Sequence, residues 1–384
     1  MQEVIVREGK KDDPKMTVLL EEAVNSYTKT YMAGNQALGR NLDANAMRNH
    51  FYRFPGVDND KDKTLSAMLR MAVIAQTQER YEKAPTETDE QRAEKAALEG
   101  LVKQLFVELK RDFKPSDLPP YTLVKLGVHL ANTSQPEESI AYFDEILDPS
   151  EPDPVRKKAR INGMSKYRKN AVFGKAVALG RSKDNAKVET AIKMMKDELS
   201  KEESSANPDR KAMEDAQYNL VKFTSARQDW PSVIAAADKY RENKSYKKNL
   251  PEVLYLQGEA YLKQNELDKA LINFMNITGT YKGLVKWSAP AVLAQMDTLW
   301  KRNTMSQGAG KQPSDRYIAW KAGSQYVQLL DTPANRKKMT AEDSALVNEV
   351  KDKTAKFGSD PAVSQERADI AAYEAAIRAA KGQK

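Results

Sequence analysis

The 384-residue sequence contains no cysteine, which excludes disulfide bonds, thiolate metal sites and cysteine nucleophiles. It has only two histidines, His50 and His129, and neither has neighbours at metal-ligand spacing. Histidine ligands normally occur in clusters, so we interpret both residues as structural. No apolar run approaches the roughly 18 residues that a membrane helix needs. We therefore expect no membrane span, no metal and no cofactor.

A strong excess of one charge is also missing, because 62 basic residues are balanced by 54 acidic residues to give a net charge of +8. Basic clusters occur at 156–169, 244–248 and 336–338, but acidic residues lie close to most of them. We interpret this pattern as a mixed, solvated surface, on which nucleic acid is not the expected partner. Binding of a polyanion, either nucleic acid or an anionic envelope polymer, is the alternative interpretation.

Catalytic and ligand-binding motifs are incomplete. Asp58, Asp60 and Asp62 have the spacing of a calcium loop, but the loop's glycine and distal glutamate are missing. The segment 308–312 has part of a phosphate-loop pattern, without its first glycine or the following Ser or Thr. We therefore predict a protein that is not an enzyme and has no small-molecule substrate. An enzyme with an unrecognised site is a third interpretation.

Helical periodicity dominates the sequence, and only the segment 3–7 has the alternation of a strand. The pattern predicts a flexible segment at 1–13, a helical region at 14–118, helical repeats at 119–302, a loop at 303–314 and a second helical region at 315–384. Before the repeats, helices are expected at 15–38, 42–54, 64–83 and 88–113.

Two segments within 119–302 read as helical hairpins of the same kind. Gly258 and Phe274 are sixteen residues apart, and so are Gly127 and Phe143. Weaker hairpins are expected at 171–199 and 216–240, with Gly174 and Leu220 at the position of the glycine. Trp230 is the expected cap of the second helix in the latter hairpin. Helical pairs of this kind stack to bury their apolar surface, so several are needed for stability.

The segment 255–277 resembles the tetratricopeptide repeat, and the residues that match are Leu254, Gly258, Tyr261, Ala270 and Phe274. The first hairpin is similar at Leu123, Leu126, Gly127 and Phe143. The resemblance implies an all-α, right-handed α-solenoid, with helical extensions at both ends. It also implies that Gly258 lets its helix approach Ala270 closely.

In this family, partners bind to the outward stripe of each first helix. The residues placed there by the resemblance are Glu252, Tyr255, Glu259, Leu262, Lys263, Tyr121, Val124, Val128, Ala131 and Asn132, with Gln217, Val221, Thr224 and Ser225 in the third hairpin. Tyr121, Val124 and Val128 have an alternative interpretation, in which they pack against the N-terminal helices.

The expected function is a non-catalytic scaffold that binds a protein or peptide partner. The repeats are most similar to those of bacterial cell-envelope proteins of this class. The opening residues contain no signal peptide. We expect a periplasmic or envelope-associated protein if a signal peptide has been removed, and a cytoplasmic protein otherwise.

Overall fold

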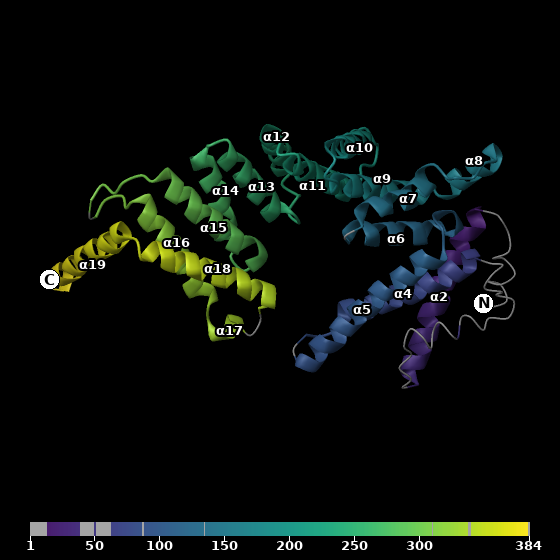
Figure 1. Ribbon diagram of the computed structural model, residues 1–384, viewed down its shortest axis with the longest axis horizontal. Coiled ribbons are helices and arrows are strands. Elements are labelled where there is room, and N and C mark those ends of the chain that lie inside the picture. The colour runs from purple at the N-terminus through teal and green to yellow at the C-terminus, as the bar shows by residue number, and fades with distance from the viewer. Residues whose placement is uncertain are drawn as a thin grey trace. The chain divides into compact units, whose positions relative to one another are not determined.

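The computed structural model describes residues 14–38, 50, 63–86, 88–133, 135–308, 310–336 and 339–382. Within these ranges every regular element is a helix, which confirms the all-α prediction for them (Figure 1). The segment 3–7, nearly all of the expected helix at 42–54 and the acidic loop with Asp58, Asp60 and Asp62 lie outside the described residues. The chain divides into two compact units, Met1–Met194 and Met195–Lys384.

The first unit contains the N-terminal helices and the first predicted hairpin. Its elements are α2 (Pro14–Ala37), α4 (Lys63–Lys83), α5 (Asp89–Asp112), the short 3-10 helix η1 (Pro115–Asp117), α6 (Pro120–Asn132), α7 (Pro136–Leu147), α8 (Pro154–Gly163), α9 (Ser165–Gly180) and the start of α10 (Asn185–Glu203). Three expected helices appear within two residues of their predicted bounds as α2, α4 and α5. Thr88 forms a capping box with Gln91, which explains where α5 begins.

Helix α8 is not among the predicted elements. Asp153 caps it by accepting hydrogen bonds from the backbone amides of Val155 and Arg156, and Pro154 occupies its first turn. None of the residues of α8 is buried. Four of its ten residues are Lys or Arg, so the sequence here was interpreted only as a basic cluster.

Phe143 of α7 holds the first hairpin against the next one. Its ring is fully buried, and a Cβ placed on Gly127 or Gly174 would come within 2.8 Å or 2.2 Å of it. The ring thus lies between α6 and α9, which both need glycine to leave room for it. The prediction that Gly174 packs inside its own hairpin is wrong, because its close contact crosses from α9 to α7.

The second unit continues from α10 with the remaining hairpins. Its helices are α11 (Arg210–Ala226), α12 (Trp230–Glu242), α13 (Leu250–Lys263), α14 (Leu267–Thr280), α15 (Val285–Arg302), α16 (Asp315–Leu330), α17 (Pro333–Arg336), α18 (Ala341–Gly358) and α19 (Pro361–Gly382). From α11 to α16 each helix packs on the next, and the alternate helices α11, α13 and α15 also touch. This sequential packing is the arrangement found in helical solenoids.

The hairpins α11–α12 and α13–α14 turn in the same way. Gln228 and Asn265 both adopt left-handed backbone conformations, with φ of 59° and 61°. The next amide donates to a carbonyl five residues back in each turn, from Asp229 to Thr224 at 3.1 Å and from Glu266 to Tyr261 at 2.8 Å. These bonds satisfy carbonyls at the helix end and fix equivalent positions 37 residues apart.

The side chain of Asp229 accepts a hydrogen bond from the amide of Ser232 and caps α12. The prediction that Trp230 caps this helix is therefore wrong. An aspartate carboxylate can accept the unpaired amides of the first turn, whereas an indole has no acceptor for them.

The same 37-residue offset shows how the two hairpins fill their cores. Val221 stands where Gly258 stands, and Ala237 stands where Phe274 stands. A Cβ on Gly258 would lie 2.6 Å from the Phe274 ring, so Phe274, and not Ala270 as predicted, sets the close approach. One hairpin pairs glycine with phenylalanine and the other pairs valine with alanine, which exchanges large and small residues across the same contact.

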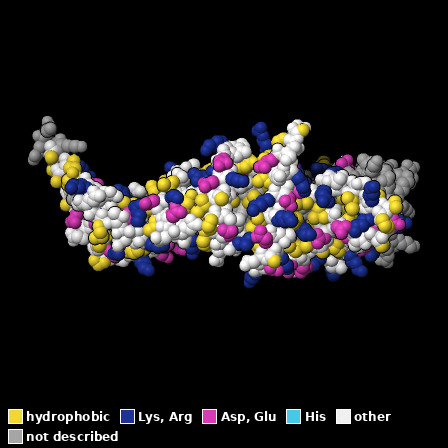
Figure 2. All heavy atoms as spheres, turned by 90° about the horizontal axis from the view of Figure 1, so that it is seen from above, with side chains coloured by type: hydrophobic (Ala, Val, Ile, Leu, Met, Phe, Trp, Pro, Cys, Tyr) yellow, Lys and Arg dark blue, Asp and Glu magenta, His cyan; other side chains and the backbone are white. Residues whose placement is uncertain are grey.

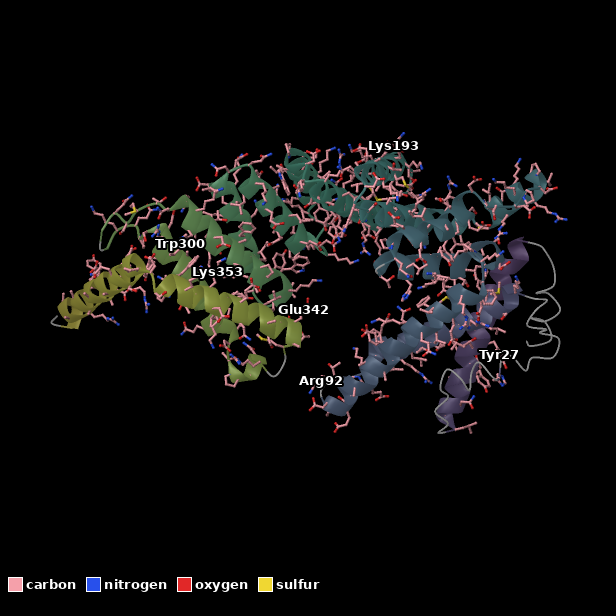
Figure 3. The ribbon with its side chains drawn as sticks, viewed as in Figure 1. Tyr27, Arg92, Lys193, Trp300, Glu342 and Lys353 are labelled. Carbon is pink, nitrogen blue, oxygen red and sulfur yellow. The ribbon has the colours of Figure 1, made fainter. Side chains whose placement is uncertain are left out.

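The last part of the unit is closed by α18, which packs on both α15 and α16. Trp300 of α15 stacks on Phe357 of α18 with ring centroids 3.9 Å apart. Lys353 reaches Asp297 at 2.5 Å, and Figure 3 labels Trp300 and Lys353 in this region. These contacts join two helices that are separated by more than 35 residues in the sequence.

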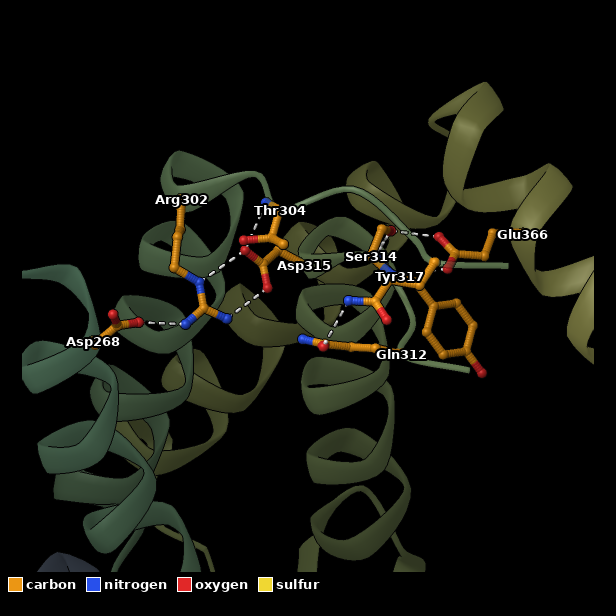
Figure 4. A network of polar contacts seen from close by, with 9 residues as sticks. Asp268, Arg302, Thr304, Gln312, Ser314, Asp315, Tyr317 and Glu366 are labelled. Atoms are coloured by element: carbon orange, nitrogen blue, oxygen red, sulfur yellow. Dashed lines mark hydrogen bonds and ion pairs between the residues drawn. The ribbon is translucent and has the colours of Figure 1, made fainter. Parts of the chain in front are cut away.

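The described residues of the segment 303–314, between α15 and α16, form no helix, as predicted. A polar network fixes its two ends (Figure 4). The guanidinium of Arg302 donates to both carboxylate oxygens of Asp315, at 2.8 and 2.6 Å, and the amide of Thr304 donates to the same carboxylate at 2.8 Å. Asp315 is fully buried. Burial opposes its ionisation, but these donors hold the pKa of the carboxyl below its usual value.

Candidate partner-binding face

The solvent-facing side of α13 carries an aromatic residue between polar ones. Tyr255 is half-buried, and its ring lies 5.8 Å from that of Phe274 at an angle of 55°. Leu262 packs partly against the same cluster, and Lys263 is exposed. Four of the residues predicted on this helix, Tyr255, Glu259, Leu262 and Lys263, therefore share one face with an apolar base and a polar edge.

Tyr255 and Glu259 form a hydrogen-bonded pair on this face. Burial raises the pKa of Tyr255 to about 12, and the adjacent carboxylate of Glu259 adds to the shift. Burial also raises the pKa of Glu259, against the hydrogen bond from Tyr255 and the charge of Lys263. A carboxylate that is partly removed from water gains from any further donor or cation, so a partner that supplies one would be favoured here.

The equivalent position on α11 carries a second tyrosine. Tyr218 lies 37 residues before Tyr255, and its hydroxyl donates to Glu252 of α13 at 2.5 Å. Lys222 lies 3.8 Å from the same carboxylate, and its ammonium group is 5.3 Å from the centre of the Tyr218 ring. Each of these two neighbouring helices thus carries a tyrosine whose hydroxyl donates to a glutamate of α13, across the helix pair for Tyr218 and within α13 for Tyr255.

Sequence reasoning missed Tyr218 and Lys222. It placed Gln217, Val221 and Thr224 on the outward stripe of α11, and all three are buried. The error comes from aligning Leu220 with Gly258, one residue out of register. The signal that would have corrected it is the polar turn, where Gln228 and Asp229 match Asn265 and Glu266. We define the α11–α13 face as Tyr218, Lys222, Glu252, Tyr255, Glu259, Leu262 and Lys263.

The residues predicted on α6 do not all reach solvent. Val124 is 7% exposed and belongs to the hydrophobic cluster that includes Met71 and Phe106 of the N-terminal helices. Tyr121 packs partly against this cluster. Val128 is 39% exposed and Asn132 is also exposed. The alternative interpretation, packing against the N-terminal helices, describes Val124 and Tyr121.

A cavity of about 420 Å³ opens between α5 and the end of α6. His129 stacks on Phe106 at its floor, with ring centroids 3.9 Å apart. Burial lowers the pKa of His129, and the nearby Lys103 contributes. Lys103 and Lys110 at the rim are already paired with Glu99 and Glu138. The rim therefore offers little net charge to a ligand.

The surface seen in Figure 2 mixes Lys and Arg side chains with Asp and Glu side chains, in line with the predicted solvated surface. Among the described residues, no group of three or more His, Asp and Glu side chains is arranged to hold a metal ion. None of the described helices combines the length and the apolar composition that crossing a bilayer needs. Comparisons with protein-family models, with curated proteins and with solved structures find no match to this chain.

Proposed function

We propose that the chain is a non-catalytic scaffold that binds a protein or peptide partner through the α11–α13 face. The observation that carries the proposal is the tyrosine at the same position of both helices, each with its hydroxyl on a glutamate of α13, Tyr218 with Glu252 and Tyr255 with Glu259. Aromatic side chains contribute most to many interfaces, since they bury large area at a low cost in side-chain entropy. An extended segment or an amphipathic helix lying across α11 and α13 would meet both pairs.

The architecture proposed with this function is a right-handed α-solenoid of tetratricopeptide-like hairpins. The sequential packing of α11 to α16 and the common turn of two hairpins support it. The proposed setting is a complex of a bacterial cell envelope, in the periplasm if a signal peptide has been removed. Its support is the resemblance of the repeats to those of envelope proteins.

Affinity capture after crosslinking in cells of the source organism tests the proposal. We compare the wild-type chain with the Tyr255→Ala/Leu262→Ala variant. The matched control is Ile272→Ala/Met275→Ala on α14, where the side chains are 59% and 55% exposed. A partner should be retained by the control and lost from the first variant.

A further variant separates lost binding from lost folding. Tyr255 also packs on Phe274, so its removal affects stability, whereas Lys263 is exposed. Lys263→Glu should leave the circular dichroism spectrum and the thermal unfolding unchanged and should weaken capture. Equal capture by wild type, Tyr255→Ala/Leu262→Ala and Lys263→Glu would overturn the proposal.

A second candidate function is polyanion binding in the first unit. The segment 154–183 contains ten basic residues and no acidic residue. Salt bridges from other segments pair Lys157 and Arg160, whereas the side chains of Arg156 and Lys158 have no partner among the described residues. If this candidate is right, binding of a DNA duplex should weaken steeply with salt and should be lost in Arg156→Glu/Lys158→Glu. Binding that does not depend on salt or on this variant would exclude it.

A further inference from the structure

A second cavity, of about 440 Å³, opens where α16, α18 and the start of α19 pack on one another (Figure 1). All three helices belong to the second compact unit. The lining of the cavity includes Trp320, Ser324 and Val327 of α16, Lys351 and Ala355 of α18, and Arg367 of α19.

The charge of the lining is positive. Lys351 and Arg367 are cations, and none of the described residues that line the cavity is acidic. Lys351 is shared with Asp331, whose carboxylate lies 3.3 Å from the ammonium nitrogen. The guanidinium of Arg367 makes no hydrogen bond or salt bridge to a described residue. Arg367 therefore brings a full positive charge and free N–H donors to the cavity.

The acidic residues at the start of α19 have other partners. The carboxylate of Asp360 lies 3.4 Å from the guanidinium of Arg316 and also accepts a hydrogen bond from the amide of Ala362 at 2.9 Å. The carboxylate of Glu366 accepts hydrogen bonds from the amide and the hydroxyl of Ser314 (Figure 4). The charge of the neighbouring arginine in α19 is thus left for a ligand.

The indole of Trp320 places a second donor beside Arg367. The guanidinium lies over the indole ring, 4.1 Å from its centre, and this contact holds it in place. The indole N–H has no hydrogen-bond partner among the described residues. A Cβ on Gly358 would lie 2.9 Å from the indole nitrogen and 3.7 Å from Nη1 of Arg367. The two donors therefore approach the same point, and glycine leaves it uncovered.

Ser324 adds a third donor from the same side of α16. It follows Trp320 by four residues, so the two side chains are neighbours on the helix surface. Its hydroxyl also has no partner among the described residues. Val327 and Ala355 supply apolar surface next to these donors. The cavity thus combines unpaired donors, a positive charge and an apolar wall.

We propose that this cavity binds a carboxylate group that is joined to an apolar body. The planar guanidinium of Arg367 matches the two oxygens of a carboxylate, and hydrogen bonds to a charged acceptor are the strong ones. Trp320 and Ser324 donate to the same group, and the apolar body contacts Val327 and Ala355. None of these residues belongs to the α11–α13 face, so this site does not depend on the proposed function.

The signal of the Trp320 indole N–H in a proton–nitrogen correlation spectrum tests the site. The chain has four tryptophans, and a Trp320→Phe variant identifies the signal of this one. Hexanoate at millimolar concentration should shift the signal. Hexanamide has the same apolar body without the charge and should leave it in place. No shift with hexanoate, or an equal shift with hexanamide, would overturn the proposal.

Two arginine variants of α19 locate the binding. Arg367→Gln should weaken the binding of hexanoate roughly tenfold or more, because it removes the charged donor. The matched control, Arg378→Gln, removes the same charge from an exposed position further along the same helix and should bind as wild type. Thermal unfolding of both variants checks that the fold is kept. Binding by Arg367→Gln that equals wild type would contradict the assignment.

A peptide separates two sources of the carboxylate. A pentapeptide with blocked ends and one central glutamate should bind more tightly than hexanoate if the natural ligand is an acidic side chain of a protein. Tighter binding of hexanoate supports a free carboxylic acid. Inorganic phosphate that shifts the Trp320 signal as strongly as hexanoate would overturn the choice of a carboxylate.

Discussion

The hairpins α11–α12 and α13–α14 have the same turn and the same outward tyrosine, but they fill their cores in opposite ways. In α13–α14 the two helices meet where Gly258 contacts Phe274. In α11–α12 the equivalent positions hold Val221 and Ala237. Val221 and Ala237 are both fully buried, as are Phe274 and Ala270. The helices keep their partners because the total volume across the contact is similar.

This difference shows which features define the repeat in this chain. Both hairpins have the left-handed turn residue and the outward tyrosine at equivalent positions, whereas only one of them has the glycine. The α6–α7 hairpin supports this view, since the ring of Phe143 needs two glycines, Gly127 and Gly174. A phenylalanine at this position requires a glycine on each helix that faces its ring. An alanine at this position does not.

The largest expected effect comes from removing the ring. Phe274→Ala should lower the free energy of unfolding by about 3–5 kcal/mol, because it leaves a cavity at a fully buried site. Adding Gly258→Val then reproduces the pair found in α11–α12 and should recover about 1–2 kcal/mol. Urea unfolding of the two variants and the wild type measures both steps.

Gly258→Val alone provides the control for this cycle. It should destabilise by about 1–3 kcal/mol, because the new Cβ would lie 2.6 Å from the Phe274 ring. Strictly additive effects of the two substitutions would mean that these residues do not share one contact, and the comparison of the hairpins would fail.

A smaller effect is expected at Gly174, the glycine that faces Phe143 from α9. Gly174→Ala should cost about 1–3 kcal/mol, since its Cβ would lie 2.2 Å from a ring that is already held by Gly127. Gly279→Ala on α14 has open space around the new methyl group and should stabilise by about 0.5–1 kcal/mol. Thermal unfolding of both variants tests this, and equal effects would refute the packing described for Phe143.

The hydroxyl groups of the two tyrosines should each contribute to stability. Tyr218→Phe and Tyr255→Phe each remove one hydroxyl that donates to a glutamate, and each should cost about 0.5–1.5 kcal/mol. Chemical denaturation of each variant measures the cost. No cost for a variant would mean that its tyrosine hydroxyl does not contribute a hydrogen bond to the folded state.

The smallest effect is a dependence on pH at Glu259. Burial holds its folded-state pKa above the ordinary 4.5, so ionisation costs the folded state more than the unfolded state. This penalty is absent below pH 4.5, grows as pH rises from 4.5 to the folded-state pKa and is constant above it. The stability of Glu259→Gln relative to wild type should therefore increase between these limits in a series of urea titrations. A relative decrease would contradict the assigned shift.

Much of the fold follows from the sequence, because long amphipathic helices with caps are local features. The bounds of α4 and α5, the α6–α7 and α13–α14 hairpins and the helix-free segment 303–314 were predicted in this way. Helix α8 was missed because it is short, strongly basic and buries no residue, so its sequence was interpreted only as a basic cluster. The cap at Asp229 was assigned one residue too late, since helix ends depend on single hydrogen bonds that periodicity does not detect.

The candidate site was predicted in part. Tyr255, Glu259, Leu262 and Lys263 share one face because i, i+4 and i+7 spacing fixes this within a helix. The residues of α11 that complete the face could be predicted only from the alignment of α11 with α13. That alignment was wrong because α11–α12 lacks the glycine and phenylalanine that mark the contact in α13–α14. The burial of Val124 depends on how α4 and α5 cover α6, which only tertiary packing decides.

Photocrosslinking in living cells tests most directly whether the α11–α13 face binds a partner. A photoreactive amino acid is placed at Lys222, at Lys263 or, as the control, at Ile272 on α14, where each side chain reaches solvent. The account predicts the same discrete crosslinked partner from positions 222 and 263 and none from position 272. Crosslinks from position 272 alone, or no crosslink from either position on the face, would contradict it.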